Sequence, residues 1–385
     1  MDFTLTETQT ELRALADRII GDHAAVERIR DVERAGAAGG DGIDRELWGA
    51  LAQAGILRAF AEPDGGVGDG GAGDDAAADD AAVGVLEAAL VCEAHGRHVA
   101  PVPLWPAVAA LLALREAGEA AADVAAVREA VAAGDDLVTV ALAEVGQTAP
   151  GPGSTAADGV GLLTGAKLAV PAAPLARWAL VPVGRPAPAL HLVDLTAEGV
   201  AVDRVITTDR SVAGHLRLTG APSVRLGGPD LVERLLAVAT VVVCGTQVGV
   251  CAEAVRRTGE YLNAREQFGR PISAFQGPVL RIADAHIDTE AMRVTTLQAA
   301  WRLATGRPAA EAVATAKWWA AEAGHRVVHS GQHLHGGIGA DVDYPIHRYF
   351  LWGKQLVDTL GGASAQAAEL GRLLAAQART GEEAA

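Results

Sequence analysis

The spacing of apolar residues divides the chain into three regions. Near the N-terminus Leu12, Leu15 and Ile19 fall on one face of a helix, and Ala- and Leu-rich stretches continue to about residue 135. From there to residue 226 the pattern changes to short apolar runs such as WALVPV and ALHLVDL, separated by Gly, Pro and Asp, which is typical of strands and turns. Helical spacing returns after Pro229.

We therefore predict an α+β fold built from three domains. Residues 1–135 are expected to form an N-terminal helical domain, residues 136–226 a middle antiparallel β-domain, and residues 227–385 a C-terminal four-helix bundle. The first helix of the bundle should begin near Leu231, and the other three should cover the Ala-rich segments 276–304, 308–334 and 345–378.

Three local segments refine this picture. Thr4, Thr6 or Thr8 can cap the first helix, because a threonine hydroxyl accepts a hydrogen bond from a free N–H of the first turn. Residues 62–82 are rich in Gly, Asp and Ala without an apolar period, which predicts an acidic surface loop. The most apolar stretch, 235–250, is interrupted by polar residues and is shorter than the about 20 residues of a membrane span, so it predicts a buried helix.

Composition and charge narrow the possible partners and the compartment. The formal charge is −16, from 32 basic and 48 acidic residues, and no basic stripe is apparent, so nucleic acid is not an expected partner. The three cysteines form no CxxC pair, which favours a reducing compartment over a disulfide scaffold. Because the N-terminal residues also lack the features of a signal peptide, we expect a cytoplasmic protein without a membrane segment.

The histidines of the C-terminal half raise the question of a metal site. His325 and His329 are one helical turn apart, but no cysteine or acidic residue stands at a fitting position beside them. A helix surface explains these side chains better, and we predict no metal site.

Two motifs of the C-terminal half and one at the N-terminus carry a resemblance. They are YLNAREQFGRPI at 261–272 with FQ at 275–276, HGGIG followed by DYP and arginine at 335–348, and FTLTETQTELR at 3–13. This set resembles the acyl-CoA dehydrogenase family over nearly the whole chain. The resemblance implies FAD as cofactor, α,β-dehydrogenation of an acyl-CoA thioester, and an electron-transfer flavoprotein as electron acceptor.

The same resemblance assigns residues to the flavin. It places Arg265 against the diphosphate, whose oxygens a guanidinium can bind in a bidentate manner, and it places Phe268 at the flavin as a flat apolar surface. Glycines allow backbone amides to approach a diphosphate closely. Where the family often has glutamine before the glycines, this chain has His333, with Gln332 beside it. The residues assigned to FAD are Arg265, Gln267, Phe268, Gln276, Gln332, His333, Gly336 and Gly337, of which Gln276 reaches the adenine end of a neighbouring subunit's flavin.

The glutamate that serves the family as catalytic base is missing from both of its usual positions. Counted from Gly336, the position used in the commonest branch is Leu360, and counted from Phe268 the position of a second branch is Ala239. Two carboxylates lie near these positions in the sequence, namely Glu233 and Asp358. Either could act only if its helix were shifted toward the flavin.

Three functions remain open at this point. The chain can be a base-lacking subunit that completes the flavin site of a sister subunit in a heteromeric acyl-CoA dehydrogenase. Its local sequence is similar to that of actinobacterial enzymes that act on steroid side-chain CoA thioesters. It can instead be a self-sufficient homomeric dehydrogenase that uses Glu233 or Asp358. The third function is a non-enzymatic scaffold that binds flavin or acyl-CoA. The identity of the acyl group is not readable from the sequence.

Overall fold

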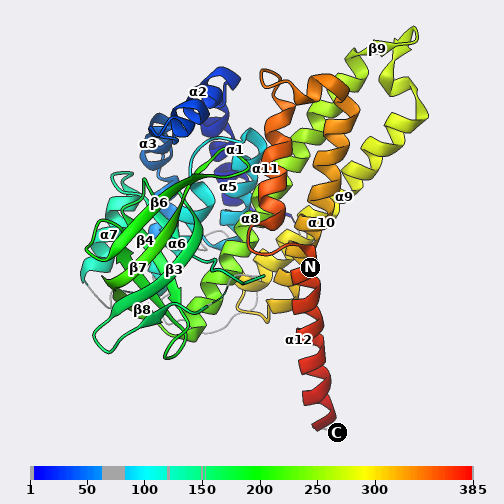
Figure 1. Ribbon diagram of the computed structural model, residues 1–385. Coiled ribbons are helices and arrows are strands. Elements are labelled where there is room, and N and C mark those ends of the chain that lie inside the picture. Colours follow the sequence, from blue (N-terminus) through cyan, green and yellow to red (C-terminus); the bar gives the residue numbers. More distant parts are fainter. Residues whose placement is uncertain (1–3, 63–82, 119–121, 149–150, 152, 384–385) are drawn as a thin grey trace.

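The computed structural model describes residues 4–62, 83–118, 122–148, 151 and 153–383. It confirms the order of a helical region, a β-domain and a second helical region (Figure 1). The predicted acidic loop at 62–82 lies outside the described residues except for Glu62.

The first region consists of short helices packed around one apolar core. In α1, Thr6 is the N-cap among the three threonines considered, and its hydroxyl forms a capping box with Gln9. The core of the region includes Trp48, Phe60 and Leu111, which are almost completely buried. The helices are α1 (Glu7–Asp22), α2 (Val26–Ala37), α3 (Arg45–Gln53), α4 (Ile56–Ala61), α5 (Val85–His98), α6 (Leu104–Glu116) and α7 (Ala122–Ala132).

The middle domain contains two four-stranded sheets, in the orders β1-β4-β5-β8 and β2-β3-β7-β6. The predicted antiparallel pairing holds for these strands with one exception, because β1 runs parallel to β4 with Val138 opposite Trp178. The strands are β1 (Val138–Val140), β2 (Ala156–Ala157), β3 (Leu162–Pro171), β4 (Trp178–Val183), β5 (Ala189–Asp194), β6 (Val200–Ile206), β7 (Val212–Pro222) and β8 (Val224–Gly227).

The last region begins with the long helices α8 (Pro229–Ala264), α9 (Gln276–Ala304) and α10 (Ala310–His335). A small hairpin, β9 (Glu266–Gln267) and β10 (Arg270–Pro271), projects between α8 and α9 at one end of the molecule (Figure 1). The segment predicted as one helix over 345–378 is in fact two, α11 (Ile346–Asp358) and α12 (Ala363–Glu383). The expected four-helix bundle is therefore a helical domain of α8 to α12.

Helix α8 contains the apolar stretch 235–250. It is long and apolar enough to cross a membrane, but 78% of its most apolar window is buried inside the protein. A helix that is apolar on all sides and covered by its neighbours is a core helix. Among the described residues, the stretch 235–250 therefore lies in a buried helix, as the sequence predicted.

Helices α5 and α8 approach each other at glycines. A Cβ on Gly249 would overlap the carbonyl oxygen of Glu93, and one on Gly96 would overlap that of Thr246. We predict that Gly249→Ala lowers the free energy of unfolding by about 1–3 kcal/mol, because the helices must separate. Gly259→Ala is the matched control, since it lies on the same helix with open space around it and should be neutral or slightly stabilising. Equal unfolding midpoints in urea for the two variants would contradict this account of the packing.

Candidate functional site

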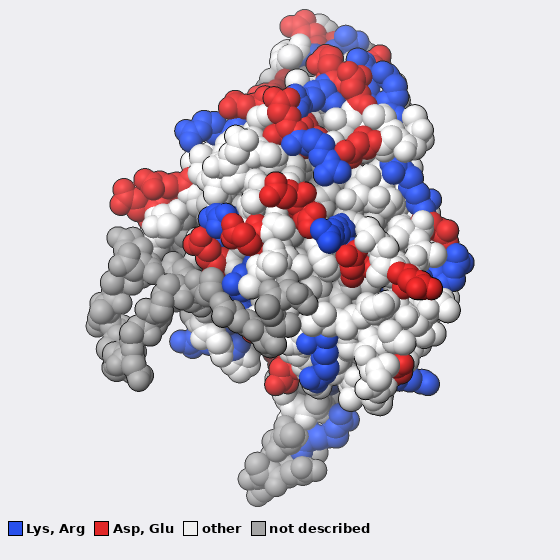
Figure 2. Space-filling model, turned by 90° about the vertical axis from the view of Figure 1, so that its left-hand side faces the viewer, with Lys and Arg blue, Asp and Glu red and all other residues white. Residues whose placement is uncertain are grey.

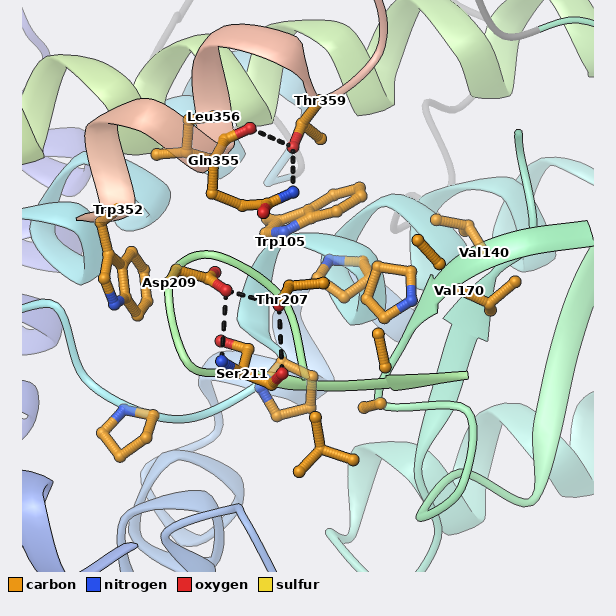
Figure 3. Close-up of a pocket in the computed structure, with 18 of the residues that line it drawn as sticks. Trp105, Val140, Val170, Thr207, Asp209, Ser211, Trp352, Gln355, Leu356 and Thr359 are labelled. Atoms are coloured by element: carbon orange, nitrogen blue, oxygen red, sulfur yellow. Dashed lines mark hydrogen bonds between the residues drawn. The ribbon is translucent and has the colours of Figure 1, made fainter. Parts of the chain in front are cut away.

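A cavity of about 250 Å³ lies where the three domains meet (Figure 3). Its wall is mainly apolar, with strand residues on one side and the end of α11 on the other. Apolar residues of the wall include Ile43, Val102, Trp105, Val140, Leu142, Val170, Val212, Trp352, Leu356 and Leu360. Polar residues of the wall are His95, Thr207, Asp209, Ser211, Gln355, Asp358 and Thr359.

The turn after α11 brings Leu360 to the cavity. Leu360 adopts a left-handed backbone conformation with φ of 64°, which is rare for a branched residue, and Gly361 follows with φ of 92°. This turn separates α11 from α12 and explains why the predicted single helix is interrupted. Position 360, where the commonest branch of the family carries its glutamate, therefore lines the cavity with an aliphatic side chain.

A buried lysine holds the end of α11 in place. Lys317 donates hydrogen bonds to the carbonyl oxygens of Leu356 at 2.9 Å and Val357 at 3.1 Å, which lie in the last turn of the helix. Burial lowers the pKa of Lys317 to about 8. The sequence analysis did not single out this residue, because a lysine within an Ala-rich helix looks like an ordinary surface position.

The β6–β7 loop supplies a second feature that the sequence analysis missed. Asp209 points from this loop into the cavity, and its Oδ1 accepts hydrogen bonds from Thr207 Oγ1 at 2.6 Å and from the Ser211 N–H at 3.2 Å (Figure 3). Burial raises the pKa of Asp209, although the bonds from Thr207 and Ser211 oppose the rise. The loop also contacts α11, since the Thr208 N–H donates to Gln355 Oε1 at 3.1 Å.

The other residues considered as bases lie in different surroundings. Ala239 is completely buried in the helical core, and it does not line the cavity. Glu233 is an exposed residue of α8 on the side facing Arg372 and is also absent from the cavity wall. Asp358 lines the cavity but remains exposed to solvent. Of the two proposed substitutes, only Asp358 therefore borders the cavity.

Three of the residues assigned to the flavin lie at the β9–β10 hairpin. Arg265 and Gln267 are exposed, and the Phe268 side chain is 92% exposed, with its backbone in a left-handed conformation (φ of 55°). Within the described residues no ion pair involves Arg265, because nearby Glu260 pairs with Arg256 instead. The hairpin thus presents an arginine without a carboxylate partner and an uncovered aromatic ring.

The two C-terminal motifs meet at the base of this hairpin. The rings of Tyr261 and His335 stack with centroids 4.4 Å apart, and the Tyr261 hydroxyl donates to the His335 carbonyl oxygen at 3.4 Å. Gly336 follows with φ of 63°, and a Cβ on Gly336 or Gly337 would meet open space. Motifs that are far apart in the sequence therefore form one surface.

The remaining residues assigned to FAD surround the same end of the helical domain. Gln276 is the first residue of α9 and is exposed, as is His333 on α10. Gln332 is partly buried, and its Oε1 has no hydrogen-bond partner among the described residues. We call the set Arg265, Gln267, Phe268, Gln276, Gln332, His333, Gly336 and Gly337 the hairpin surface.

The hairpin surface and the cavity are separate places on the molecule. No residue of the hairpin surface lines the cavity. In Figure 1 the β9–β10 hairpin stands at the far end of α8 and α9, away from the β-domain that forms one cavity wall. One copy of the chain therefore does not bring these two sets of residues together, and a site that needs both must include a second chain.

Charged residues of both signs are mixed on the face of the molecule that Figure 2 shows. Lysine and arginine alternate there with aspartate and glutamate, and no basic stripe is visible. Among the described residues no group of three or more His, Cys, Asp or Glu could hold a metal ion.

Comparison with known families supports the resemblance. Residues 227–370 match the family model described as acyl-CoA dehydrogenase, C-terminal domain. The chain is 40% identical to the acyl-CoA dehydrogenase FadE27 of Mycobacterium tuberculosis (strain ATCC 25618 / H37Rv) over 390 aligned residues, which cover 97% of this chain and 99% of that protein.

Solved structures point to the same family. A variant of the Tcur3481–Tcur3483 steroid ACAD is 43% identical with a TM-score of 0.86, over 98% of this chain and 100% of that one. The ChsE4–ChsE5 complex from Mycobacterium tuberculosis is 38% identical with a TM-score of 0.82, over 97% of this chain and 99% of that one. The family acts on CH–CH groups as FAD-dependent oxidoreductases. With near-complete coverage at these identities, the chain belongs to the acyl-CoA dehydrogenase family.

Proposed function

We propose that this chain is a subunit of a heteromeric FAD-dependent dehydrogenase that acts on the CoA thioester of a steroid side chain. The observation that carries the proposal is the separation of the hairpin surface from the cavity, together with Leu360 at the position of the usual glutamate. Two similar structures are named as two-component assemblies, and one of them is named a steroid ACAD. An electron-transfer flavoprotein is the proposed acceptor of the electrons.

The hairpin surface fits the diphosphate of FAD bound mainly to a neighbouring subunit. The Arg265 guanidinium forms no ion pair with any residue that the structure describes, and its planar fork can take two phosphate oxygens. Gly336 and Gly337 leave open space beside their backbone, as close approach by an anion requires. Phe268 offers an exposed ring to cover an apolar face of the ligand. FAD, when bound, supplies the acceptor for the hydride that leaves the acyl chain.

Removal of the α-proton is assigned to the sister subunit. Leu360 has no group that can accept a proton, and Ala239 is buried away from the cavity. A heteromer resolves this by placing the glutamate in one chain and the hairpin surface in the other. All three cysteines of the chain are free and buried, which supports the proposed cytoplasmic location.

The second candidate function is a homomeric enzyme with a displaced base. It rests on Asp358, which lines the cavity two residues before the usual position. Its side chain is exposed and shorter than glutamate, so it is the less favoured candidate. Asp358→Asn should abolish turnover if this alternative holds, and it should leave the turnover of a heteromer largely unchanged.

The test measures flavin content and substrate-dependent bleaching for the chain alone and for the chain with its sister subunit. We expect bleaching of the flavin absorbance by acyl-CoA only when both chains are present. Bleaching by the purified homomer would overturn the heteromer proposal. A complex that holds no flavin at all would overturn the assignment of the hairpin surface.

A matched pair of variants tests the hairpin surface directly. Arg265→Ala is expected to weaken FAD binding by the complex at least about tenfold, because a charge-assisted bidentate contact is lost. Arg217→Ala is the control, since Arg217 is an exposed arginine of β7 that takes no part in the hairpin surface. Equal flavin-to-protein ratios after dialysis of the two variants would remove Arg265 from the site.

A further inference from the structure

A small pocket lies between the start of α2 and three helices of other regions. Its volume is about 30 Å³, which is room for a particle of about the size of a water molecule. The polar side chains of its wall are His98 at the end of α5, Arg257 of α8, and Arg348 and Tyr349 of α11. No carboxylate is among the described residues that line it.

The N-terminus of α2 opens on this pocket without a side-chain cap. Its N-cap residue is Ala25, which has no side-chain oxygen, and the first helical residue, Val26, lines the pocket. Among the described residues no backbone carbonyl accepts from the N–H groups of Val26, Glu27 or Arg28. These free N–H groups give the helix end a partial positive charge.

Arg348 brings a buried donor to the same pocket. The residue is 2% exposed, and Glu33 accepts from its Nε at 3.0 Å and from its Nη2 at 3.2 Å. Nη1 is buried without a hydrogen-bond partner in the described part of the chain. A charged donor in this state is costly, because it has given up water without gaining an acceptor. Arg348 is also the arginine of the motif at 335–348, and the proposed reaction assigns it no role.

The carboxylate beside Arg348 does not neutralise the charges around it. Glu33 pairs with Arg348 and also with Arg210, whose Nη1 lies 3.3 Å from Glu33 Oε2. Two guanidinium groups therefore share one carboxylate, and a positive charge remains in excess at this side of the pocket.

Arg257 adds a second guanidinium to the wall. Its Nε lies 2.8 Å from Glu253 Oε1 but is buried without a hydrogen-bond partner among the described residues. Glu253 also accepts from Arg256 Nη2 at 2.7 Å, so this carboxylate is shared as well. The guanidinium of Arg257 lies 5.3 Å from the ring centroid of Tyr349, which holds it against the pocket wall.

We propose that this pocket binds a halide ion, such as chloride, through Arg348, Arg257 and the free N–H groups at the start of α2. The three groups are donors that carry full or partial positive charge, and a halide ion only accepts. The bound ion would join α2 of the first region to α8 and α11 of the helical domain. No residue of the pocket belongs to the cavity or to the hairpin surface, so the proposal is independent of the dehydrogenation.

A water molecule fits this pocket less well than an anion does. Water has two hydrogens to donate, and it needs acceptors for them. The Arg97 carbonyl oxygen beside the pocket already accepts from the Tyr349 hydroxyl at 3.0 Å. The Nε2 of His98 lies 3.1 Å from Asp17 Oδ1, a carboxylate that does not line the pocket. Water would also leave the excess positive charge without a counter-ion.

The experiment measures chloride binding by the line broadening of chloride NMR, on the full chain in the assembly in which it purifies. Sodium gluconate keeps the ionic strength constant. Arg257→Gln should weaken chloride binding at least about tenfold, because a charged donor is lost. Arg256→Gln is the matched control, since Arg256 pairs with the same Glu253 on the same helix but does not line the pocket. The control should bind chloride within about threefold of the wild type.

A second variant places an anion of the protein itself at the helix end. Ala25 is exposed, and Ala25→Asp supplies a carboxylate that can accept from the free N–H groups of the first turn. This variant should bind chloride at least about tenfold more weakly than the wild type, because the carboxylate competes for the same donors and repels the ion. Crystals of the wild type grown with bromide should show an anomalous peak between Arg257 and Arg348.

Three results would overturn the proposal. They are no saturable binding of chloride by the wild type, equal affinity of the wild type and Arg257→Gln for chloride, and a water molecule without anomalous signal in the pocket of the bromide crystals. If Arg257→Gln does not fold, Ala25→Asp takes its place in the titration. Undiminished chloride binding by Ala25→Asp would then place the ion elsewhere.

Discussion

Replacing Glu144 with alanine is expected to lower the free energy of unfolding by about 3–5 kcal/mol. The Glu144 carboxylate accepts from Lys167 Nζ at 2.7 Å and from the backbone N–H and hydroxyl of Ser154 at 2.6 and 2.8 Å. The Lys167 side chain is completely buried and has Pro182 O as its other partner, at 2.7 Å. Without Glu144 the ammonium group would remain in the β-domain without a counter-charge.

A control and an acid titration separate this effect from ordinary surface changes. Asp203→Ala removes an ion pair in which both side chains are 64% exposed, and it should cost less than about 1 kcal/mol. Urea unfolding of both variants gives the comparison, and equal midpoints would contradict the role of the buried pair.

The pKa of Glu144 predicts the pH at which this stabilisation is lost. Burial alone would raise the pKa, but the bonds from Lys167, Thr155 and Ser154 outweigh it and lower the pKa to about 2. Because the pKa in the folded protein lies below the ordinary glutamate value of 4.5, the stabilisation is complete above pH 4.5 and declines as the pH falls toward 2. Glu144→Ala should not show this part of the decline.

His95→Gln is expected to remove a loss of stability that the wild type shows on acidification. Burial lowers the pKa of His95 to about 4, although the bond to Ala100 opposes the change. Between pH 6.5 and pH 4 the imidazole of residue 95 is protonated in the unfolded chain but stays neutral in the folded chain. This histidine therefore leaves the free energy of unfolding unchanged above pH 6.5 and lowers it by on the order of 3 kcal/mol as the pH decreases to 4.

The measurement compares urea midpoints of wild type and variant over this pH range. Carboxylates titrate in both proteins, so the difference between the two curves isolates His95. A glutamine amide can still donate toward Ala100 O, which also accepts from the Val102 N–H at 2.8 Å, so the variant should fold. Parallel curves for the two proteins would show that residue 95 is not buried in its neutral form.

The sequence predicted the long elements well because their signals are strong. The periodic Ala-rich stretch at 276–304 predicted α9 with its observed bounds, and the short apolar runs predicted the strands β4 and β5. The interruption at 359–362 was missed, because it depends on a left-handed Leu360 that no local preference predicts. The parallel pairing of β1 with β4 was missed for a similar reason, since strand partners are set by tertiary packing.

The site was predictable only where a motif extends over many residues. The resemblance led to Arg265, Phe268 and the glycines, and the structure places them on one surface, although their contact with FAD remains a prediction. Counting from Gly336 led to Leu360, and the structure places this residue on the cavity wall. Asp209 carried no signal, because a lone aspartate in a hairpin turn is common and its cavity is formed by distant segments.

The separation of the hairpin surface from the cavity has a consequence for how such chains diverge. Substitutions at one place leave the chemistry of the other intact, so natural selection can act on them independently. After a gene duplication, one copy can lose its glutamate while the hairpin surface stays under constraint through the flavin of its neighbour. Under the proposed heteromer, catalysis would no longer constrain the cavity of that copy.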